Sequence, residues 1–195
     1  MTVERRNLKL CEIKVDAGSE ETGVFSGYGA FFGNVDSYGD VIEKGAFAET
    51  LKEWKARGKY PPMLLQHGGM GVDADGMLPV GQWTNMQEDD KGLRVEGKLF
   101  ALNTARGQYI YEGLQSGVLD GLSIGFMVRE EKRGTRSEEP ERTLLNIDLW
   151  ELSIVTFPAN DKARISDVKA SSDATDIVNS IQALTQKFVR AAFER

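Results

Sequence analysis

Short segments in which hydrophobic and polar residues alternate cover most of the chain and predict a protein built mainly from β-strands. In the clearest segment, Leu93, Val95 and Leu99 fall on one face and charged residues fall on the other. By the same criterion, strands are predicted over residues 8–15, 24–32, 80–86, 93–100, 122–128 and 143–157, and the apolar run 63–65 adds one more. Glycine- and aspartate-rich stretches separate these segments and predict turns.

Two segments with a helical period interrupt the strands. The first helix is predicted over residues 46–57, where apolar side chains recur at i, i+4 and i+7. The second begins with Asn103 or Thr104 as its cap and runs to about residue 115. Strands that follow one another with so few helices favour a mainly antiparallel sheet, closed into a barrel or folded as a sandwich, with helices packed outside.

The composition changes after residue 165. Residues 166–176 are rich in Ser, Asp, Ala and Lys, as in a linker, and apolar residues recur at helical spacing beyond them. We therefore expect a folded domain over residues 1–165, a linker over 166–176 and an amphipathic helix over 177–195.

Composition and charge exclude several classes of partner. The chain has 195 residues and a net charge of −6, with no basic stripe, so we expect no nucleic-acid partner. No apolar run is long enough to cross a membrane, and the first residues lack the apolar core of a signal peptide. The single cysteine, Cys11, cannot form an intramolecular disulfide and fits a reducing cytosol.

The chain contains one histidine, His67, which limits the possible chemistry. A site with two or three histidine ligands is excluded within one chain, and Cys11 alone cannot complete a structural zinc site, so no metal is expected. Three possibilities remain: a serine or cysteine nucleophile served by one imidazole, a site based on carboxylates, or no catalysis.

The segment Gly121-Leu122-Ser123-Ile124-Gly125 has the spacing of a nucleophile elbow but not its context. The chain continues as a strand after Ser123, and the histidine precedes the serine, so an α/β-hydrolase is excluded. Ser123 is still a candidate nucleophile, because the flanking glycines leave room for a substrate and expose backbone N–H groups to an oxyanion.

A third group normally orients the imidazole of a serine hydrolase. Glu151 is the first candidate, since it ends an apolar stripe formed by alternate residues of its strand, and Asp148, on the opposite face, is the second. Each of these residues alone also has an ordinary structural explanation, so the residues themselves leave catalytic and non-catalytic interpretations open.

Four blocks of sequence, in a fixed order, carry a resemblance to a known family. They are GYGAFFGNVD running into GDVIEKGAF (27–47), MLLQH (63–67), GLSIGF (121–126) and ELSIVTFPAN (151–160). In these blocks the chain resembles the prohead (capsid maturation) serine proteases of tailed bacteriophages, which are similar in fold to the herpesvirus assemblins. The resemblance covers about residues 8–165 and identifies them as a prohead-protease catalytic domain.

The resemblance implies a serine endopeptidase without a cofactor that cleaves phage major capsid protein, scaffold and itself inside the assembling prohead, in the host cytoplasm. It implies a mainly β fold with flanking helices, in the form of a closed or nearly closed antiparallel barrel. Carried over by position, Ser123 is the nucleophile, His67 the base and Glu151 the orienting residue, where assemblins use a second histidine. Backbone N–H groups of Ile124 and Gly125 are candidates for the oxyanion hole.

Other functions remain open at this stage. The amphipathic segment 177–195 favours a catalytically silent capsid assembly or scaffolding module, because an apolar face on a linker often binds a partner, although it could equally pack on the barrel. A small-molecule esterase is a third possibility. The assemblin-like relatives also imply a dimer.

Overall fold

The fold was obtained as a computed structural model, which describes residues 4–6, 22–69, 74–136, 138–158 and 161–169. The strands are β1 (Glu4–Arg6), β2 (Val24–Phe31), β3 (Asp40–Ile42), β4 (Met63–Leu65), β5 (Gly81–Glu88), β6 (Gly92–Leu99), β7 (Gly121–Arg133), β8 (Arg142–Val155) and β9 (Ile165–Val168). The helical segments are α1 (Ala48–Ala56), α2 (Gln66–Gly69), the 3₁₀ turn η1 (Ala74–Met77) and α3 (Ala105–Gln115). The expectation of a mainly β protein with flanking helices is confirmed.

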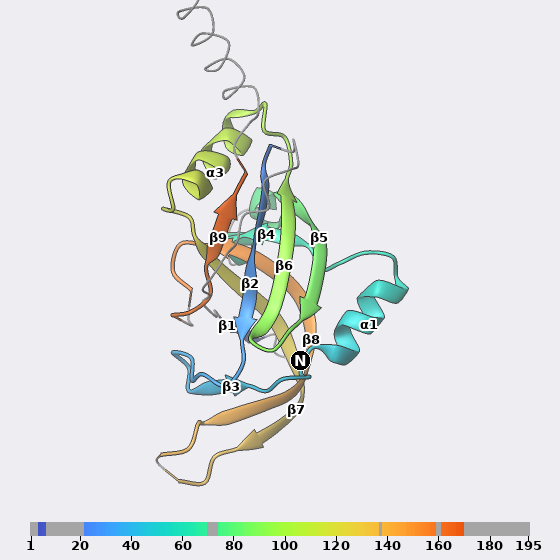
Figure 1. The fold of residues 1–195 in the computed structure, drawn as a ribbon, viewed down its shortest axis with the longest axis vertical. Coiled ribbons are helices and arrows are strands. Elements are labelled where there is room, and N and C mark those ends of the chain that lie inside the picture. The colour runs from blue at the N-terminus through green and yellow to red at the C-terminus, as the bar shows by residue number, and fades with distance from the viewer. Residues whose placement is uncertain (1–3, 7–21, 70–73, 137, 159–160, 170–195) are drawn as a thin grey trace, which may run out of the picture.

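The predicted closed or nearly closed antiparallel barrel is wrong. The nine described strands form one open, mixed sheet, in the order β1-β7-β8-β4-β5-β6-β2-β9, with β3 paired to β8 beside this path. Both β3 and β4 run parallel to β8, because the chain passes through helix α1 between them and returns in the same direction. The sheet ends at two short strands, β1 and β9 (Figure 1).

The alternating pattern determines which face of the sheet is buried. In β6, Leu93 and Val95 are fully buried and Leu99 is nearly so, while the charged residues between them point away from the core. β6 lies between β5 and β2, and the ring of Phe25 packs edge-on against that of Trp83 at 5.6 Å between centroids. The apolar positions of the sequence therefore make the core as predicted.

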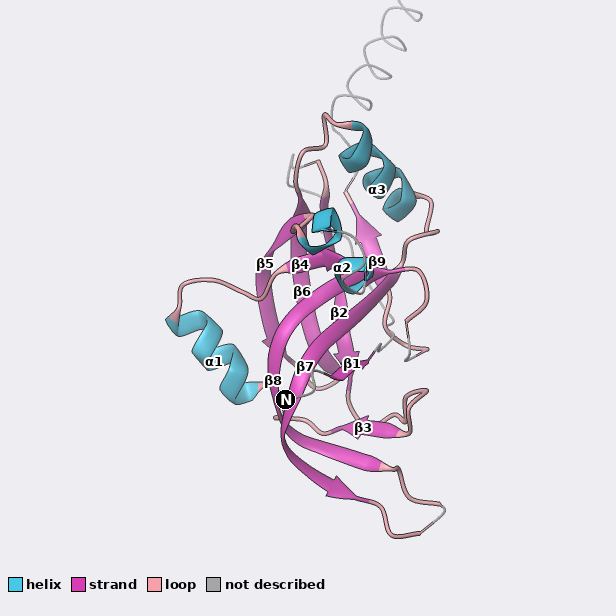
Figure 2. Cartoon of the chain, turned by 180° about the vertical axis from the view of Figure 1, so that it is seen from behind, coloured by secondary structure: helices cyan, strands magenta, loops and turns pink. Residues whose placement is uncertain are grey.

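Strand β8 is the framework of the molecule. Its 14 residues pair with β7 along one edge, and Figure 2 shows both strands as long curved ribbons that extend beyond the rest of the sheet. On its other edge β8 pairs with β3 at one end and with β4 at the other. Helix α1 covers the stretch between them: Thr50 Oγ1 accepts the Leu149 N–H at 3.0 Å, and Trp54 Nε1 donates to the Leu149 carbonyl at 2.8 Å.

Several sequence predictions can be compared with the described elements. The helix predicted over residues 46–57 is α1, and the second helix is α3, whose cap is Thr104: its hydroxyl accepts the Gly107 N–H at 3.2 Å. Residues 166–168 of the predicted linker belong to β9. The strand predicted over 8–15, residues 170–176 of the linker and the helix over 177–195 lie outside the described residues. No helix in the described ranges is long and apolar enough to cross a membrane.

A buried ion pair joins β3 to β8. The Arg142 guanidinium donates to both carboxylate oxygens of Asp40, at 3.0 and 2.8 Å, and the side chains are 8% and 1% exposed. Arg142→Ala would leave the Asp40 charge buried without this partner, so we expect about 3–5 kcal/mol less stability in denaturant unfolding. Arg133→Ala, which removes an exposed partner of Glu131, is the control, with a loss below about 0.5 kcal/mol. Equal losses in both variants would contradict this assignment.

Candidate active site

His67 lies immediately after β4, in a turn of left-handed backbone. The turn α2 follows the strand directly, and φ is 52° at Gln66, 55° at His67, 70° at Gly68 and 63° at Gly69. A residue with a Cβ atom is disfavoured in this region by about 1–2 kcal/mol, so two successive non-glycine residues there need support from their surroundings. The turn ends the strand abruptly and leaves the His67 ring above the neighbouring strand, β8.

Side chains from β8 and its C-terminal extension support this turn. Gln66 Nε2 donates to Thr156 Oγ1 at 2.6 Å, and the Thr156 N–H donates to Gln66 Oε1 at 3.4 Å. The backbone N–H of His67 donates to Ser153 Oγ at 3.2 Å. Gly68 packs against η1, where a Cβ atom would meet the Met77 sulfur at 2.4 Å. The strained backbone is therefore fixed from two sides.

Glu151 reaches the site through a bulge in β8. Gly125 of β7 pairs with Glu151, but the next residue, Phe126, pairs with Leu149, so Trp150 is the extra residue. The bulge reverses the alternation: Leu149 and Leu152 both point into the core, and Glu151 shares the opposite face with Ser153. The sequence alternation had placed Glu151 on the apolar stripe instead, and the bulge is the physical reason for the difference.

Three side chains from neighbouring strands meet at this face. Ser123 on β7 lies opposite Ser153 on β8, and its Oγ is in hydrogen-bond contact with Nε2 of His67. His67 Nδ1 lies 2.6 Å from Glu151 Oε1. Ser123 is fully buried in the chain, and the side chains of His67 and Glu151 are 9% and 14% exposed. The contacts form a line from hydroxyl to imidazole to carboxylate.

The partners determine the position of the imidazole hydrogen. A carboxylate only accepts hydrogen bonds, so the Nδ1 of a neutral His67 carries the hydrogen and donates it to Glu151. The lone pair of Nε2 then faces the Ser123 hydroxyl and can take its proton. This is the arrangement that activates a serine toward a carbonyl carbon.

Comparison with known proteins identifies the family. A family model described as caudovirus prohead serine protease matches residues 9–177. The prohead protease of Enterobacteria phage HK97 is 33% identical over 172 residues, which span 88% of this chain and 70% of that relative. The chain belongs to the prohead serine protease family. It is therefore a serine peptidase of capsid maturation.

Two further similarities agree with this family. A capsid polyprotein of Pseudomonas phage PAJU2 is 30% identical over 173 residues; the match covers 85% of this protease but 23% of the polyprotein. The solved structure of the bacteriophage T4 capsid assembly protease superposes with a TM-score of 0.57 at 11% identity, over 79% of this chain and 96% of that one. The second similarity shows that the fold is shared.

The other site residues that the sequence suggested are not part of the Ser123–His67–Glu151 contacts. Asp148 has other partners: its Oδ1 lies 3.1 Å from Arg129 Nη2, and its Oδ2 accepts from the indole of Trp150. Ile124 and Gly125 lie in β7 between β1 and β8, so their amides point toward neighbouring strands. The oxyanion hole at these residues stays a prediction, because it requires an amide that sheet pairing leaves available.

Gly125 has a different role in the geometry of the protease. A Cβ atom at this position would lie 2.3 Å from Glu151 Oε1 and within 3.0 Å of two of its carbons. The absence of a side chain at Gly125 leaves the space that the Glu151 carboxylate occupies. The need for glycine at the second glycine position of the GLSIG segment is thus explained by Glu151. The motif alone does not reveal this reason.

Replacing Gly125 with alanine should displace Glu151. Because a shift of about 1 Å in a catalytic group can cost about 100-fold in rate, we expect a loss of about that size in fluorophosphonate labelling of the protease. Gly134→Ala is the matched control, since its Cβ would meet the Pro140 carbonyl oxygen at 2.3 Å, at the far end of the β7–β8 hairpin. Wild-type labelling of Gly125→Ala would refute the steric role.

Sequence reasoning missed Ser153 as a site residue. It follows Glu151 by two positions, is fully buried, and bonds both to the backbone of His67 and to the Glu151 carboxylate. The usable signal was its place in the ELSIV block, on the same strand face as Glu151 once the bulge is known.

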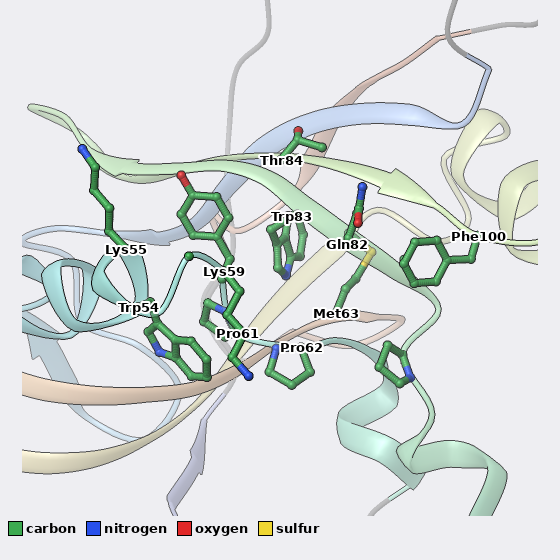
Figure 3. Close-up of a pocket in the computed structure, with 14 residues that line it drawn as sticks. Trp54, Lys55, Lys59, Pro61, Pro62, Met63, Gln82, Trp83, Thr84 and Phe100 are labelled. Carbon is green, nitrogen blue, oxygen red and sulfur yellow. The ribbon is translucent and has the colours of Figure 1, made fainter.

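A cleft of about 700 Å³ lies between the end of α1 and β5 (Figure 3). Its walls are aromatic and proline side chains with two lysines, among them Trp54, Lys55, Lys59, Pro62, Trp83 and Phe100. Met63 lines the cleft at the start of β4, whereas His67 follows the end of that strand. Ser123, His67 and Glu151 do not line this cleft. Within the described residues no group of three or more His, Cys, Asp or Glu side chains could hold a metal ion.

Proposed function

We propose that this chain is an endopeptidase in which Ser123 is the nucleophile, His67 the general base and Glu151 the residue that orients the imidazole. The line of contacts from Ser123 Oγ through both nitrogens of His67 to Glu151 Oε1 carries the proposal. The three residues come from three adjacent strands or their ends, which lets a rigid sheet fix their separations.

The geometry supports a two-step hydrolysis. Ser123 Oγ attacks the scissile carbonyl carbon while His67 Nε2 takes its proton, and the imidazolium then protonates the departing amine to leave an acyl-enzyme. Water attacks the ester with His67 again as base, and Ser123 regains its proton as the acid product leaves. Glu151 stabilises the imidazolium in both steps. General base catalysis contributes about 10²- to 10⁴-fold in rate.

The substrate that the comparisons support best is phage capsid protein. One relative is named a prohead protease, and another is a capsid polyprotein that includes a region similar to this chain. We infer that the chain cleaves capsid or scaffold protein within the prohead. Self-cleavage and dimer formation stay predictions of the sequence.

Labelling and processing together test this function. The chain, co-expressed with a phage major capsid precursor, should convert the precursor to a smaller product, detected by intact mass. A fluorophosphonate should modify Ser123, mapped by peptide mass spectrometry. Modification of another serine in its place, or an uncut precursor together with an unlabelled Ser123, would contradict the proposal. A catalytically silent scaffolding module needs no such line of contacts, and a serine peptidase family does not favour it.

A further inference from the structure

We infer that Ser153 is a positioning residue that locks the imidazole and its carboxylate into one unit; this inference rests on the proposed triad. Ser153 does not lie on the line from nucleophile to carboxylate. Ser153 closes a ring of hydrogen bonds beside that line. It bonds to the backbone of His67 and to the carboxylate of Glu151.

The ring consists of three hydrogen bonds among His67, Ser153 and Glu151. The backbone N–H of His67 donates to Ser153 Oγ at 3.2 Å, and the Ser153 hydroxyl donates to Glu151 Oε2 at 2.5 Å. The other oxygen of the same carboxylate, Oε1, lies 2.6 Å from Nδ1 of the His67 ring. The backbone and the side chain of His67 are therefore both tied to Glu151, one through Ser153 and one directly.

The direction of each bond is determined by chemistry. The His67 amide can only donate, and a carboxylate can only accept, so the Ser153 oxygen takes one hydrogen and gives its own to Oε2. The Ser153 hydroxyl thus has no hydrogen to offer elsewhere, although Ser153 lies directly across the sheet from Ser123. Its two bonds make Ser153 a support and leave Ser123 as the nucleophile.

Ser153 also acts on the backbone of the base. His67 has φ 55° and ψ 32°, a conformation that costs a residue with a Cβ atom about 1–2 kcal/mol. A buried amide without a partner is costly, so the bond to Ser153 favours the left-handed turn in which His67 reaches Glu151. Loss of the hydroxyl would release both the turn and one carboxylate oxygen.

The presence of one histidine gives this proposal a direct spectroscopic test. In protein labelled with [¹⁵N]histidine, all imidazole signals belong to His67, and the Nδ1–H proton that is bonded to Glu151 should appear at low field. Ser153→Ala should move this proton upfield or lose it to exchange with water. The rate of fluorophosphonate labelling of Ser153→Ala should fall about 10- to 100-fold. This is the size of the loss when the hydrogen-bond partner of a metal-ligating histidine is removed.

Tyr28→Phe is the matched control, because it removes another hydroxyl–carboxylate bond of 2.5 Å, to Asp89, on strand β2. It should change neither the His67 proton nor the labelling rate. If Ser153→Ala does not fold, Ser153→Cys keeps a side chain of similar shape with a weaker donor, and its labelling should still be slower than wild type. A wild-type His67 proton and labelling rate in a folded Ser153 variant would overturn the role of Ser153. A wild-type rate in Ser123→Ala would instead overturn the triad, and the two failures are distinguishable.

Discussion

Replacing Ser123 with alanine should abolish peptidase activity while the fold is kept. Removing the nucleophile of a serine protease lowers the rate by about 10⁴- to 10⁶-fold, because only binding and oxyanion stabilisation remain. Ser123 is fully buried and lies opposite Ser153 of β8, and the smaller alanine side chain fits the space that serine leaves. The measurement is processing of a co-expressed capsid precursor, read by intact mass, with thermal unfolding as the test of folding.

Ser116→Ala is the control for this variant. Ser116 is an exposed serine at the end of α3, and its hydroxyl donates to the Gly113 carbonyl at 3.1 Å. Its replacement should leave processing at the wild-type level. Cleavage that continues in Ser123→Ala at the wild-type rate would remove Ser123 from the mechanism, and Ser153, the serine directly across the sheet, would be the next residue to test.

Glu151→Gln should lower the labelling rate by about 10²- to 10⁴-fold, less than the loss of Ser123. The Ser153 hydroxyl needs an acceptor, so the carbonyl oxygen of the new amide should face Ser153 and its NH₂ group should face Nδ1 of His67. An NH₂ group there favours the tautomer with hydrogen on Nε2, which cannot accept the Ser123 proton. Pre-steady-state labelling with a fluorophosphonate measures the effect.

Asp148→Asn is the control that separates the two carboxylates of this strand. Asp148 lies beside Arg129 and the Trp150 indole, whereas Glu151 contacts the imidazole. Its amide variant should label at the wild-type rate. The opposite result, with Asp148→Asn slow and Glu151→Gln normal, would transfer the orienting role to Asp148.

The sequence predicted which residues form the candidate site better than it predicted the contacts that position them. The period of two in β6 and β7 and the N-cap of α3, predicted as Asn103 or Thr104, are local signals. They placed Leu93, Thr104 and Ser123 correctly on their elements. The family blocks supplied His67 and Glu151. The role of Ser153 depends on its position relative to two distant residues, which no local pattern encodes.

The errors have physical causes at particular residues. Trp150 is the extra residue of a bulge, and one extra residue moves every following side chain to the other face, so the alternation placed Glu151 wrongly. The sheet is not wholly antiparallel because the chain runs through α1 and returns parallel to β8, and a crossover of this kind has no signature in the periodicity of the strands. It is not a barrel because its described end strands, β1 and β9, do not pair with each other. The left-handed turn at His67 is held by Thr156 and Ser153, far along the chain.

The placement of the proposed triad on neighbouring strands has a consequence for synthesis of the protein. His67 and Ser123 are 56 residues apart in sequence, and His67 and Glu151 are 84 apart. β8 supplies Glu151 and pairs with β7 on one edge and β4 on the other, so these distant parts come together only when this last long strand has been added. A ribosome-bound chain that ends before β8 carries Ser123 and His67 without the strand that joins them, so under the proposed mechanism we expect peptidase activity only after β8 has been added.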